Sequence, residues 1–389
     1  MRMVEFRNFA ATQKAHRQLV VRAHFSTMMR LVPLLCVLFA PALARDSSSP
    51  GPLMHLVMGD WGGSPHHPYT TKQEIATAKG MGKLAAATGA KYALALGDNF
   101  YDQGVQDVSS SRFKDTFENV FTADSLQAAA GFTFHVIAGN HDHGGNVTAQ
   151  VDYSAVSKRW DYPSLWYTFT ETAGDGTTVQ YVMIDTVVLT GQSLVTDPDT
   201  GAIVRELAGH ELPGPEDAAQ ANAQLAWIEA TLKASTADFL VVAGHYPVYS
   251  ICEHGPTSWL VQNLKPLLQQ YKVTAYMNGH DHCAEHIAVP GDSAHVDYHT
   301  IGSAHENSDN TKHESSKYTP KHALKWHTGK GDGGFATVAA SKAGGFVVAH
   351  YDGDGKLLYT APARQPRSST GVVTAVKRQQ RARPQVATA

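Results

Sequence analysis

The amino-acid sequence predicts an α/β protein whose ligand site lies along the ends of its strands. Short apolar runs recur along the chain, and most of them stop at a glycine followed by a polar residue. Helix-like stretches separate these runs, and such an alternation of strands and helices is typical of α/β folds. The 389 residues are 43% hydrophobic and 17% charged, which is enough apolar material for a large buried core.

The apolar runs define the expected strands, because each is short, rich in β-branched or aromatic residues and bounded by a turn signal. Five of them are "HLVMGD", "YALALGD", "FHVIAGN", "FLVVAGH" and "VTAYMNGH", which end at Asp60, Asp98, Asn140, His245 and His280. A sixth run, "VQYVMID" (179–185), has no closing glycine, and residues 344–360 resemble a hairpin around the turn at 352–355. Helices are expected at 71–89 and 216–235, between these runs.

Both ends of the chain differ from the body. Residues 31–44, "LVPLLCVLFAPALA", have the length and the small-residue ending of a signal peptide, so residues 1–44 are predicted to be removed after Ala44. A buried strand or a membrane anchor is the alternative, although the run is short for a spanning helix. The body is expected at 45–361. Residues 362–389, which are Arg-, Gln- and Pro-rich, are expected to form a disordered basic tail.

A secretory route has two further supports. The triplet "NVT" makes Asn146 a candidate for N-glycosylation, and the mature chain would keep two cysteines, Cys252 and Cys283. In a secreted protein this pair suggests a disulfide, with two separate thiols as the alternative. We therefore expect a protein of the secretory pathway, secreted or lysosomal or vacuolar, without stable membrane insertion and monomeric.

The charge distribution excludes one class of partner. The net charge of −3 combines two basic ends with an acidic body, and a nucleic-acid-binding surface would need the opposite sign. No nucleic-acid partner is expected.

The polar residues at the strand ends form one constellation: Asp60, Asp98, Tyr101, Asn140, His141, His245, His280 and His282. Any one of them alone would be an ordinary turn, cap or surface residue, but together they recur on several strand ends. Aspartate, asparagine and histidine suit first-row metal ions, and a carboxylate can bridge two ions. The set predicts a two-metal site.

The motifs "GDWGG", "GDNFYDQG", "GNHDH", "GHYP" and "GHDH", in this order, resemble those of the metallophosphoesterases, and more closely those of the purple acid phosphatases of the small mammalian, tartrate-resistant type. The resemblance covers residues 53–360. It implies a four-layer α/β/β/α sandwich of two mixed β-sheets. Tyr101 distinguishes this branch, since it stands where the family places a phenolate on ferric iron; the alternative is a packing aromatic above the site.

The resemblance also implies a role for each residue. Asp60, Asp98, Tyr101 and His282 would hold Fe³⁺, and Asp98 would bridge to a second ion, Fe²⁺, Zn²⁺ or Mn²⁺. That second ion would be completed by Asn140, His245 and His280. The implied activity is that of a secreted acid phosphatase, in which hydroxide from this dinuclear centre attacks small phosphomonoesters or phosphoproteins.

Two histidines match family positions that protonate the leaving oxygen or bind phosphate: His141, and His254 in "CEHGP". Asp142 and His143 are expected only to support the ligands. Residues 190–215 lack the cysteine that tethers the corresponding loop in the mammalian relatives, where the loop covers the site. Three alternatives stay open: a phosphodiesterase or nucleotide hydrolase, an iron-binding carrier with little turnover, and peroxide chemistry at iron.

Overall fold

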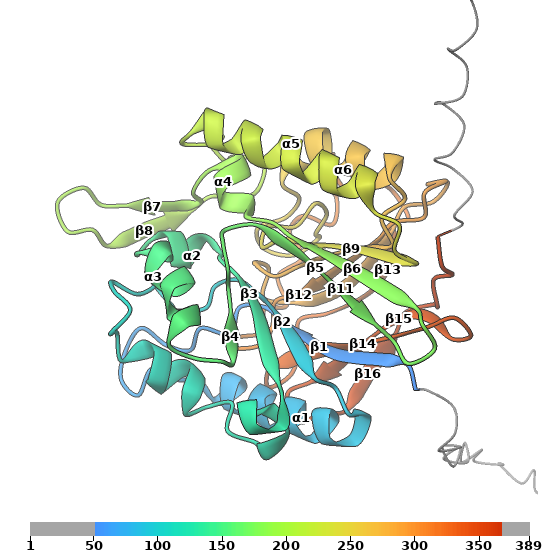
Figure 1. Ribbon diagram of the computed structural model, residues 1–389. Coiled ribbons are helices and arrows are strands. Elements are labelled where there is room, and N and C mark those ends of the chain that lie inside the picture. The colour runs from blue at the N-terminus through green and yellow to red at the C-terminus, as the bar shows by residue number, and fades with distance from the viewer. Residues whose placement is uncertain (1–50, 368–389) are drawn as a thin grey trace, which may run out of the picture. The chain divides into compact units, whose positions relative to one another are not determined.

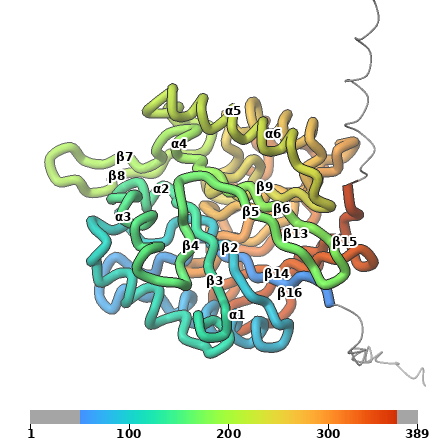
Figure 2. The backbone as a smooth tube through the Cα atoms, viewed as in Figure 1, coloured from blue at the N-terminus to red at the C-terminus, as the bar shows by residue number. Residues whose placement is uncertain are grey.

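The computed structural model of the protein describes residues 51–367, so the predicted signal peptide and most of the predicted tail lie outside the described residues. Two mixed seven-stranded sheets face one another (Figures 1 and 2). The first sheet has the strand order β16-β15-β14-β1-β2-β3-β4, and the second has the order β13-β11-β12-β10-β9-β6-β5. Helices α5 and α6 cover the outer face of the second sheet, and α1 covers the first (Figure 1). The predicted four-layer α/β/β/α sandwich is confirmed.

The elements have the following bounds. The first sheet consists of β1 Leu53–Met58, β2 Tyr92–Leu96, β3 Thr133–Ile137, β4 Trp160–Asp161, β14 Gly334–Ser341, β15 Gly345–Asp352 and β16 Leu357–Thr360. The second consists of β5 Tyr167–Thr172, β6 Thr178–Met183, β9 Phe239–Ala243, β10 Ala275–Asn278, β11 Ala284–Ala288, β12 Asp297–Ile301 and β13 Leu324–Thr328. The α-helices are α1 Lys72–Thr88, α2 Asn140–His143, α3 Val147–Asp152, α4 Thr186–Thr190, α5 Ala218–Ala234 and α6 Ser258–Gln270. A separate hairpin is formed by β7 Leu194–Thr196 and β8 Ile203–Glu206.

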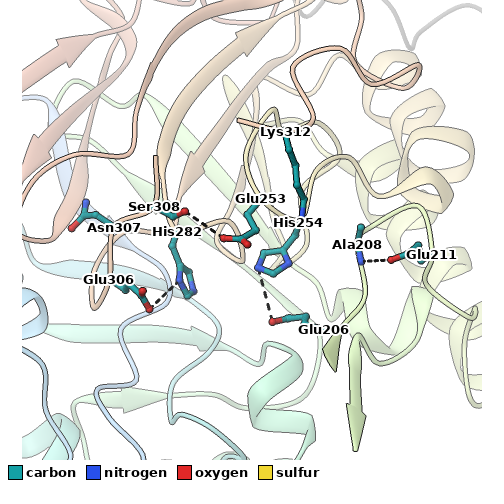
Figure 3. A pocket seen from close by; sticks show the side chains of 10 residues that line it. All are labelled: Glu206, Ala208, Glu211, Glu253, His254, His282, Glu306, Asn307, Ser308 and Lys312. Carbon is teal, nitrogen blue, oxygen red and sulfur yellow. Dashed lines mark hydrogen bonds and ion pairs between the residues drawn. The ribbon is translucent and has the colours of Figure 1, made fainter. Parts of the chain in front are cut away.

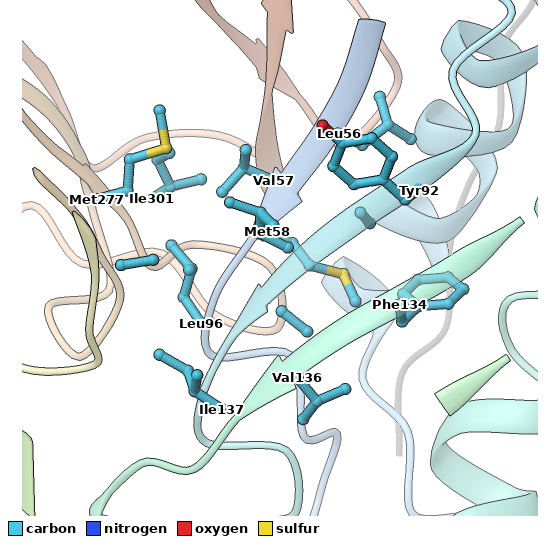
Figure 4. Close-up of a cluster of buried hydrophobic side chains, with 14 of the residues drawn as sticks. Leu56, Val57, Met58, Tyr92, Leu96, Phe134, Val136, Ile137, Met277 and Ile301 are labelled. Carbon is cyan, nitrogen blue, oxygen red and sulfur yellow. The ribbon is translucent and has the colours of Figure 1, made fainter. Parts of the chain in front are cut away.

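The central strands are buried on both faces, which explains their continuous apolar runs. In β2 and β9 every residue is buried. Leu56, Tyr92 and Phe134 of the first sheet belong to one buried cluster, which Met277 and Ile301 of the second sheet also join (Figure 4). Tyr92 reaches across to the second sheet, where its hydroxyl donates to that of Tyr181 at 3.1 Å. One core therefore joins the two sheets and fixes where their strand ends meet.

Capping residues at both ends set the bounds of helix α1. Thr71 accepts a hydrogen bond from the backbone N–H of Glu74, whose side chain accepts from the N–H of Thr71, so both residues cap the first turn. At the other end Gly89 adopts φ 74°, a left-handed conformation that glycine tolerates best. The predicted helix at 71–89 is confirmed.

The six predicted strand runs and the hairpin at 344–360 are confirmed, but one long helix is missed. Helix α6 contains Pro266, which normally argues against a helix. Its apolar stripe of Leu260, Leu264 and Leu268, spaced four residues apart and buried, was the available signal.

Residues 362–367, the first residues of the predicted tail, contact the body of the protein. Arg364 forms an antiparallel bridge with Phe346, and their backbones exchange hydrogen bonds of 2.8 and 2.9 Å. The guanidinium of Arg367 donates to the carbonyl oxygens of Ser235, Ala237 and Tyr271. These contacts hold residues 362–367 against the body, and they join residues so distant in the chain that no local pattern in the sequence announces them.

Among residues 51–367, none of the helices combines the length and the apolar character needed to cross a bilayer.

Candidate metal centre

Parallel strands of both sheets deliver the candidate ligands to one place. Strands β1, β2 and β3 run parallel in the first sheet, and β6, β9 and β10 run parallel in the second. Carboxyl ends of parallel strands lie at one edge of a sheet, which is where ligand sites of such folds occur. Asp60, Asp98 and His280 each follow a glycine at such an end and adopt φ values of 55°, 52° and 71°. Positive φ is costly for these residues, and such strain is typical of functional sites.

The glycines before the ligands leave room for close packing. At Gly97, with φ 90°, a Cβ atom would lie 2.7 Å from the backbone nitrogen of Gly139 and 2.7 Å from Nδ1 of His245. A side chain here would push two ligand segments apart. The recurring glycine is therefore needed for the approach of the segments as well as for the turn.

The first group of candidate ligands surrounds the phenol oxygen of Tyr101. That oxygen lies 3.1 Å from Oδ1 of Asp60, 3.2 Å from Oδ2 of Asp98 and 3.1 Å from Nε2 of His282. Nε2 of His282 is 3.6 Å from Oδ1 of Asp60. Ligand atoms bound at about 2 Å to one ion are separated by about 3 Å, so this spacing fits a single metal ion.

The second group extends from Asp98 on its other side. Nε2 of His245 lies 3.3 Å from Oδ2 of Asp98 and 2.8 Å from Oδ1 of Asn140. One ligand atom each from Asp98, His245 and His280 fall within 4.8 Å of one another. Nδ1 of His245 bonds the carbonyl of Leu96 at 2.8 Å, which leaves Nε2 facing the site. Asp98 thus has an oxygen in both groups, as a bridging carboxylate would.

The electrostatics of these side chains fit a cation. Asp60 and Asp98 are buried, with 0% and 1% of their surface exposed. Burial raises the pKa of Asp60, whereas the pKa of Asp98 falls because nearby imidazoles outweigh its burial. Burial and then the two carboxylates raise the pKa of Tyr101 well above its ordinary value. A phenolate at this position therefore requires a positive charge beside it, and the donor set fits a metal pair.

An acidic side chain that the sequence analysis missed lies in the centre. Oε1 of Glu206, at the end of β8, accepts a hydrogen bond from Nδ2 of Asn140 at 2.7 Å and from Oγ of Ser193 at 2.9 Å. Its other oxygen lies 3.9 Å from Nε2 of His141 and 4.0 Å from Nε2 of His254. The sequence offered no signal for Glu206, because it lies in the loop at 190–215, far from every motif.

The two candidate acids therefore converge on a single carboxylate. Nδ1 of His141 bonds the backbone carbonyl of Asp102, so its Nε2 is directed into the site. The backbone N–H of His254 donates to Oδ1 of Asp281 at 2.6 Å. Glu206 places an anionic group between both imidazoles, which marks a position that an oxygen of a bound phosphate could take.

A cleft of about 490 Å³ opens beside this point. Glu206 and His254 face one another across it, and His282 reaches it from the metal side with Glu306 beside it (Figure 3). Its remaining lining residues are Ala208, Glu211, Glu253, Asn307, Ser308 and Lys312. The hairpin β7–β8 supplies one wall through Glu206.

Asp142 and His143, which were expected only to support the ligands, lie beside the candidate centre. The carboxylate of Asp142 accepts hydrogen bonds from the backbone N–H groups of Asn99 and Gly139. Nε2 of His143 lies 2.7 Å from Oδ2 of Asp185. The carboxylate of Asp142 thus fixes backbone around the centre, whereas His143 pairs with a buried carboxylate, and neither is among the candidate ligands.

A disulfide joins Cys252 and Cys283, with an S–S distance of 2.10 Å. Of the two alternatives that the sequence left open, the bonded pair is therefore confirmed. It connects the segment that carries His254 to the segment that carries His282.

Comparison with known proteins agrees with the fold and with the motifs. The family model described as calcineurin-like phosphoesterase matches residues 55–284. Tartrate-resistant acid phosphatase type 5 of Mus musculus is 38% identical over 337 residues, 86% of this chain and 97% of its own. Purple acid phosphatase 17 of Arabidopsis thaliana is 32% identical over 63% of this chain and 66% of its own.

Among solved structures, that of GAP50, described as the anchor in the inner membrane complex of Plasmodium, is similar in fold. It superposes with a TM-score of 0.65 at 21% identity and covers 82% of this chain and 91% of its own. At this identity the likeness supports the fold alone.

The matched family and the fold define a phosphoesterase of the calcineurin-like class. Within that class the chain belongs to the family of the purple, tartrate-resistant acid phosphatases, and it is an acid phosphatase.

Proposed function

We propose that the protein is a secreted acid phosphatase that hydrolyses phosphate monoesters at a dinuclear Fe³⁺–M²⁺ centre. Fe³⁺ would be held by Asp60, Asp98, Tyr101 and His282. The divalent ion, Fe²⁺, Zn²⁺ or Mn²⁺, would be held by Asp98, Asn140, His245 and His280. The observation that carries the proposal is the phenol oxygen of Tyr101 within 3.1 to 3.2 Å of three further donor atoms. A hard phenolate among carboxylates favours a trivalent ion.

When bound, the metal pair would neutralise the phosphate and acidify the hydrolytic water, so that hydrolysis proceeds at low pH. The side chains of the protein would supply the proton that the leaving group needs. Hydrolysis of a monoester leaves an alkoxide that needs a proton, and a protonated imidazole supplies one at acidic pH. His141 and His254 are the proposed donors, and the proposal is supported by the Nε2 atoms of both, which lie 3.9 and 4.0 Å from the same oxygen of Glu206.

The cleft supports a broad substrate class. A volume of about 490 Å³ beside the centre accommodates the leaving group of a small phosphomonoester. Because its lining includes His254, His282 and the basic side chain of Lys312, the proposal also includes the phosphorylated side chain of a protein as a substrate. Small phosphomonoesters and phosphoproteins are therefore the proposed substrates.

The proposed route of the protein is the secretory pathway, to the exterior or to a lysosome or vacuole. Asn146 is exposed at the start of α3, which is compatible with an N-glycan. Mass spectrometry of the mature protein is expected to give Arg45 as its first residue and a glycan on Asn146. Size-exclusion chromatography with light scattering tests the proposed monomer.

The metal assignment is tested by the visible absorption spectrum of the purified protein and of Tyr101→Phe. Wild type is expected to show a broad phenolate-to-iron charge-transfer band, and Tyr101→Phe is expected to lose it. Tyr162→Phe is the matched control, since Tyr162 is buried and its hydroxyl makes no hydrogen bond within the described chain. A colourless but active wild type, or a band that survives in Tyr101→Phe, would contradict the assignment.

Replacement of both candidate acids separates an enzyme from an iron carrier. His141→Asn with His254→Asn is expected to lower turnover of a monoester by about 10²-fold or more, while the visible band stays. A carrier with negligible turnover would show no such loss. The same assay with diesters tests the alternative substrate class, because a phosphodiesterase would retain higher activity on them.

A further inference from the structure

A second group of metal-ligating side chains lies outside the phosphatase centre. His286 belongs to β11, and Asp297 and His299 belong to β12, the neighbouring strand. One ligand atom from each falls within 4.8 Å of the other two. The three side chains are buried, with 2%, 4% and 1% of their surface exposed. None of them is a candidate ligand of the dinuclear site, so the group needs its own explanation.

The two imidazoles are oriented by partners on their Nδ1 atoms. Nδ1 of His286 lies 3.0 Å from the hydroxyl oxygen of Tyr359, and Nδ1 of His299 lies 3.2 Å from Nε2 of His350. If each Nδ1–H donates to its partner, the lone pair of each ring is on Nε2. Histidines that bind metals almost always donate their other ring nitrogen in this way.

The carboxylate of Asp297 also has a partner on one atom and leaves its other atom toward the group. Oδ2 of Asp297 lies 3.4 Å from Nε of Arg364, whereas Oδ1 lies 3.3 Å from Nε2 of His286. Despite this distance, the buried Nε2 makes no hydrogen bond within the described chain. The two atoms are thus adjacent without the alignment of a hydrogen bond. A separation of about 3.3 Å is that of two ligands on one ion with bonds of about 2 Å.

We propose that His286, Asp297 and His299 form an additional, mononuclear site for a divalent first-row ion such as Zn²⁺. Two neutral imidazoles and one carboxylate are a donor set that such ions favour. The rings of His286 and His299 are stacked nearly parallel, with centroids 4.5 Å apart and an interplanar angle of 9°, so one ion bound by both would require the two ring planes to tilt toward each other. Burial, together with neighbouring imidazoles, lowers the pKa of His299, which keeps this ring in the neutral form that binds metals.

The ion would have a structural role. The ligands belong to the second sheet, while their partners His350 and Tyr359 belong to β15 and β16 of the first. An ion held by the ligands would therefore connect the two sheets through these hydrogen bonds. Because the ligands are almost fully buried, a substrate has no access to the ion.

The test counts the metal ions in the full-length protein. The chain is stripped with a chelator, reloaded with Zn²⁺ alone, desalted and analysed by elemental mass spectrometry. His286→Gln and His299→Gln are each expected to carry one equivalent of zinc less than wild type. His135→Gln is the matched control, since His135 also pairs with a carboxylate, that of Asp161 at 2.7 Å, but lies on β3. It is expected to keep the zinc content of wild type.

A second variant makes the test independent of the folding of the histidine variants. His245→Gln combined with His280→Gln removes two ligands of the proposed dinuclear centre and leaves the additional site intact. This chain is expected to retain a zinc ion that is lost when His299→Gln is added. Equal zinc content in wild type and His286→Gln, or no zinc dependent on His299 in the dinuclear-site variant, would overturn the proposal. Neither outcome depends on phosphatase activity.

Discussion

The carboxylate of Glu206 is expected to compete with the phosphate of a substrate, because it places a negative charge at the proposed phosphate position. The side chain comes from the hairpin β7–β8 and is held by Asn140 and Ser193. A phosphate that enters must displace this carboxylate or bind beside a like charge. We therefore expect Glu206→Ala to bind phosphate and phosphomonoesters more tightly than wild type.

The size of the effect follows from the contacts that the carboxylate must lose. It accepts two hydrogen bonds, of 2.7 and 2.9 Å, and a net value of about 1 kcal/mol for each gives about 2 kcal/mol. Without this competition, the affinity of the protein for phosphate is expected to rise by about 30-fold. Ser193→Ala removes only one of the bonds, so its expected gain is about fivefold.

The assay measures KM for a small aryl phosphate and the inhibition constant of inorganic phosphate at acidic pH. Both constants are expected to fall in Glu206→Ala, and to fall less in Ser193→Ala. Glu211→Ala is the matched control, since Glu211 is an acid of the same cleft whose contacts are with Ala208 and Arg205 at its rim. If Glu206→Ala and Glu211→Ala give the same constants, or if Glu206→Ala lowers kcat without lowering KM, the carboxylate is not a competitor of phosphate.

Three further predictions concern stability. Burial raises the pKa of Glu285 to about 7 from 4.5, so the folded state holds a proton that the unfolded state releases between these pH values. The free energy of unfolding is then expected to fall by up to about 3 kcal/mol as the pH rises through this window, and by less in Glu285→Gln; urea titrations at both ends check this. Cys283→Ser removes a disulfide that spans 31 residues, and it is expected to lower the free energy of unfolding by about 4 kcal/mol. Urea unfolding of reduced and oxidised wild type checks this, and equal midpoints would contradict it. Asn146→Ala removes the side-chain cap of α3 and is expected to cost about 1 kcal/mol; an unchanged thermal midpoint in deglycosylated protein would argue against the cap.

The sequence predicted the strands and the candidate ligands for the same physical reason. A central strand of an α/β fold is apolar along its whole length and must end where a polar residue can leave the core. Asp60, Asp98 and His245 each stand one glycine after such a run, so a single pattern predicts the strand, its end and the candidate ligand. The family resemblance added roles, but the positions were already visible in the runs.

The sequence analysis missed features that depend on contacts distant in the chain. Glu206 reaches the site only because a hairpin of the 190–215 loop folds over Asn140. The side chains of His286, Asp297 and His299 come together only through the pairing of β11 with β12. Neither contact leaves a local period or spacing in the sequence. Helix α6 is a different case, since its apolar stripe of Leu260, Leu264 and Leu268 was present in the sequence and was not read as a helix.

Asp281 shows how the fold couples the two chemical roles of the site. It lies between the candidate ligands His280 and His282, and its carboxylate accepts hydrogen bonds from the backbone N–H groups of His254 and Gly255 at 2.6 and 3.2 Å. The disulfide from Cys283 joins the same two segments a short distance further along the chain. A shift of the metal-binding segment must therefore move His254 with it, because a covalent bond and two hydrogen bonds would otherwise be strained. The candidate proton donor His254 thus keeps its distance from the candidate metal ligands through the backbone.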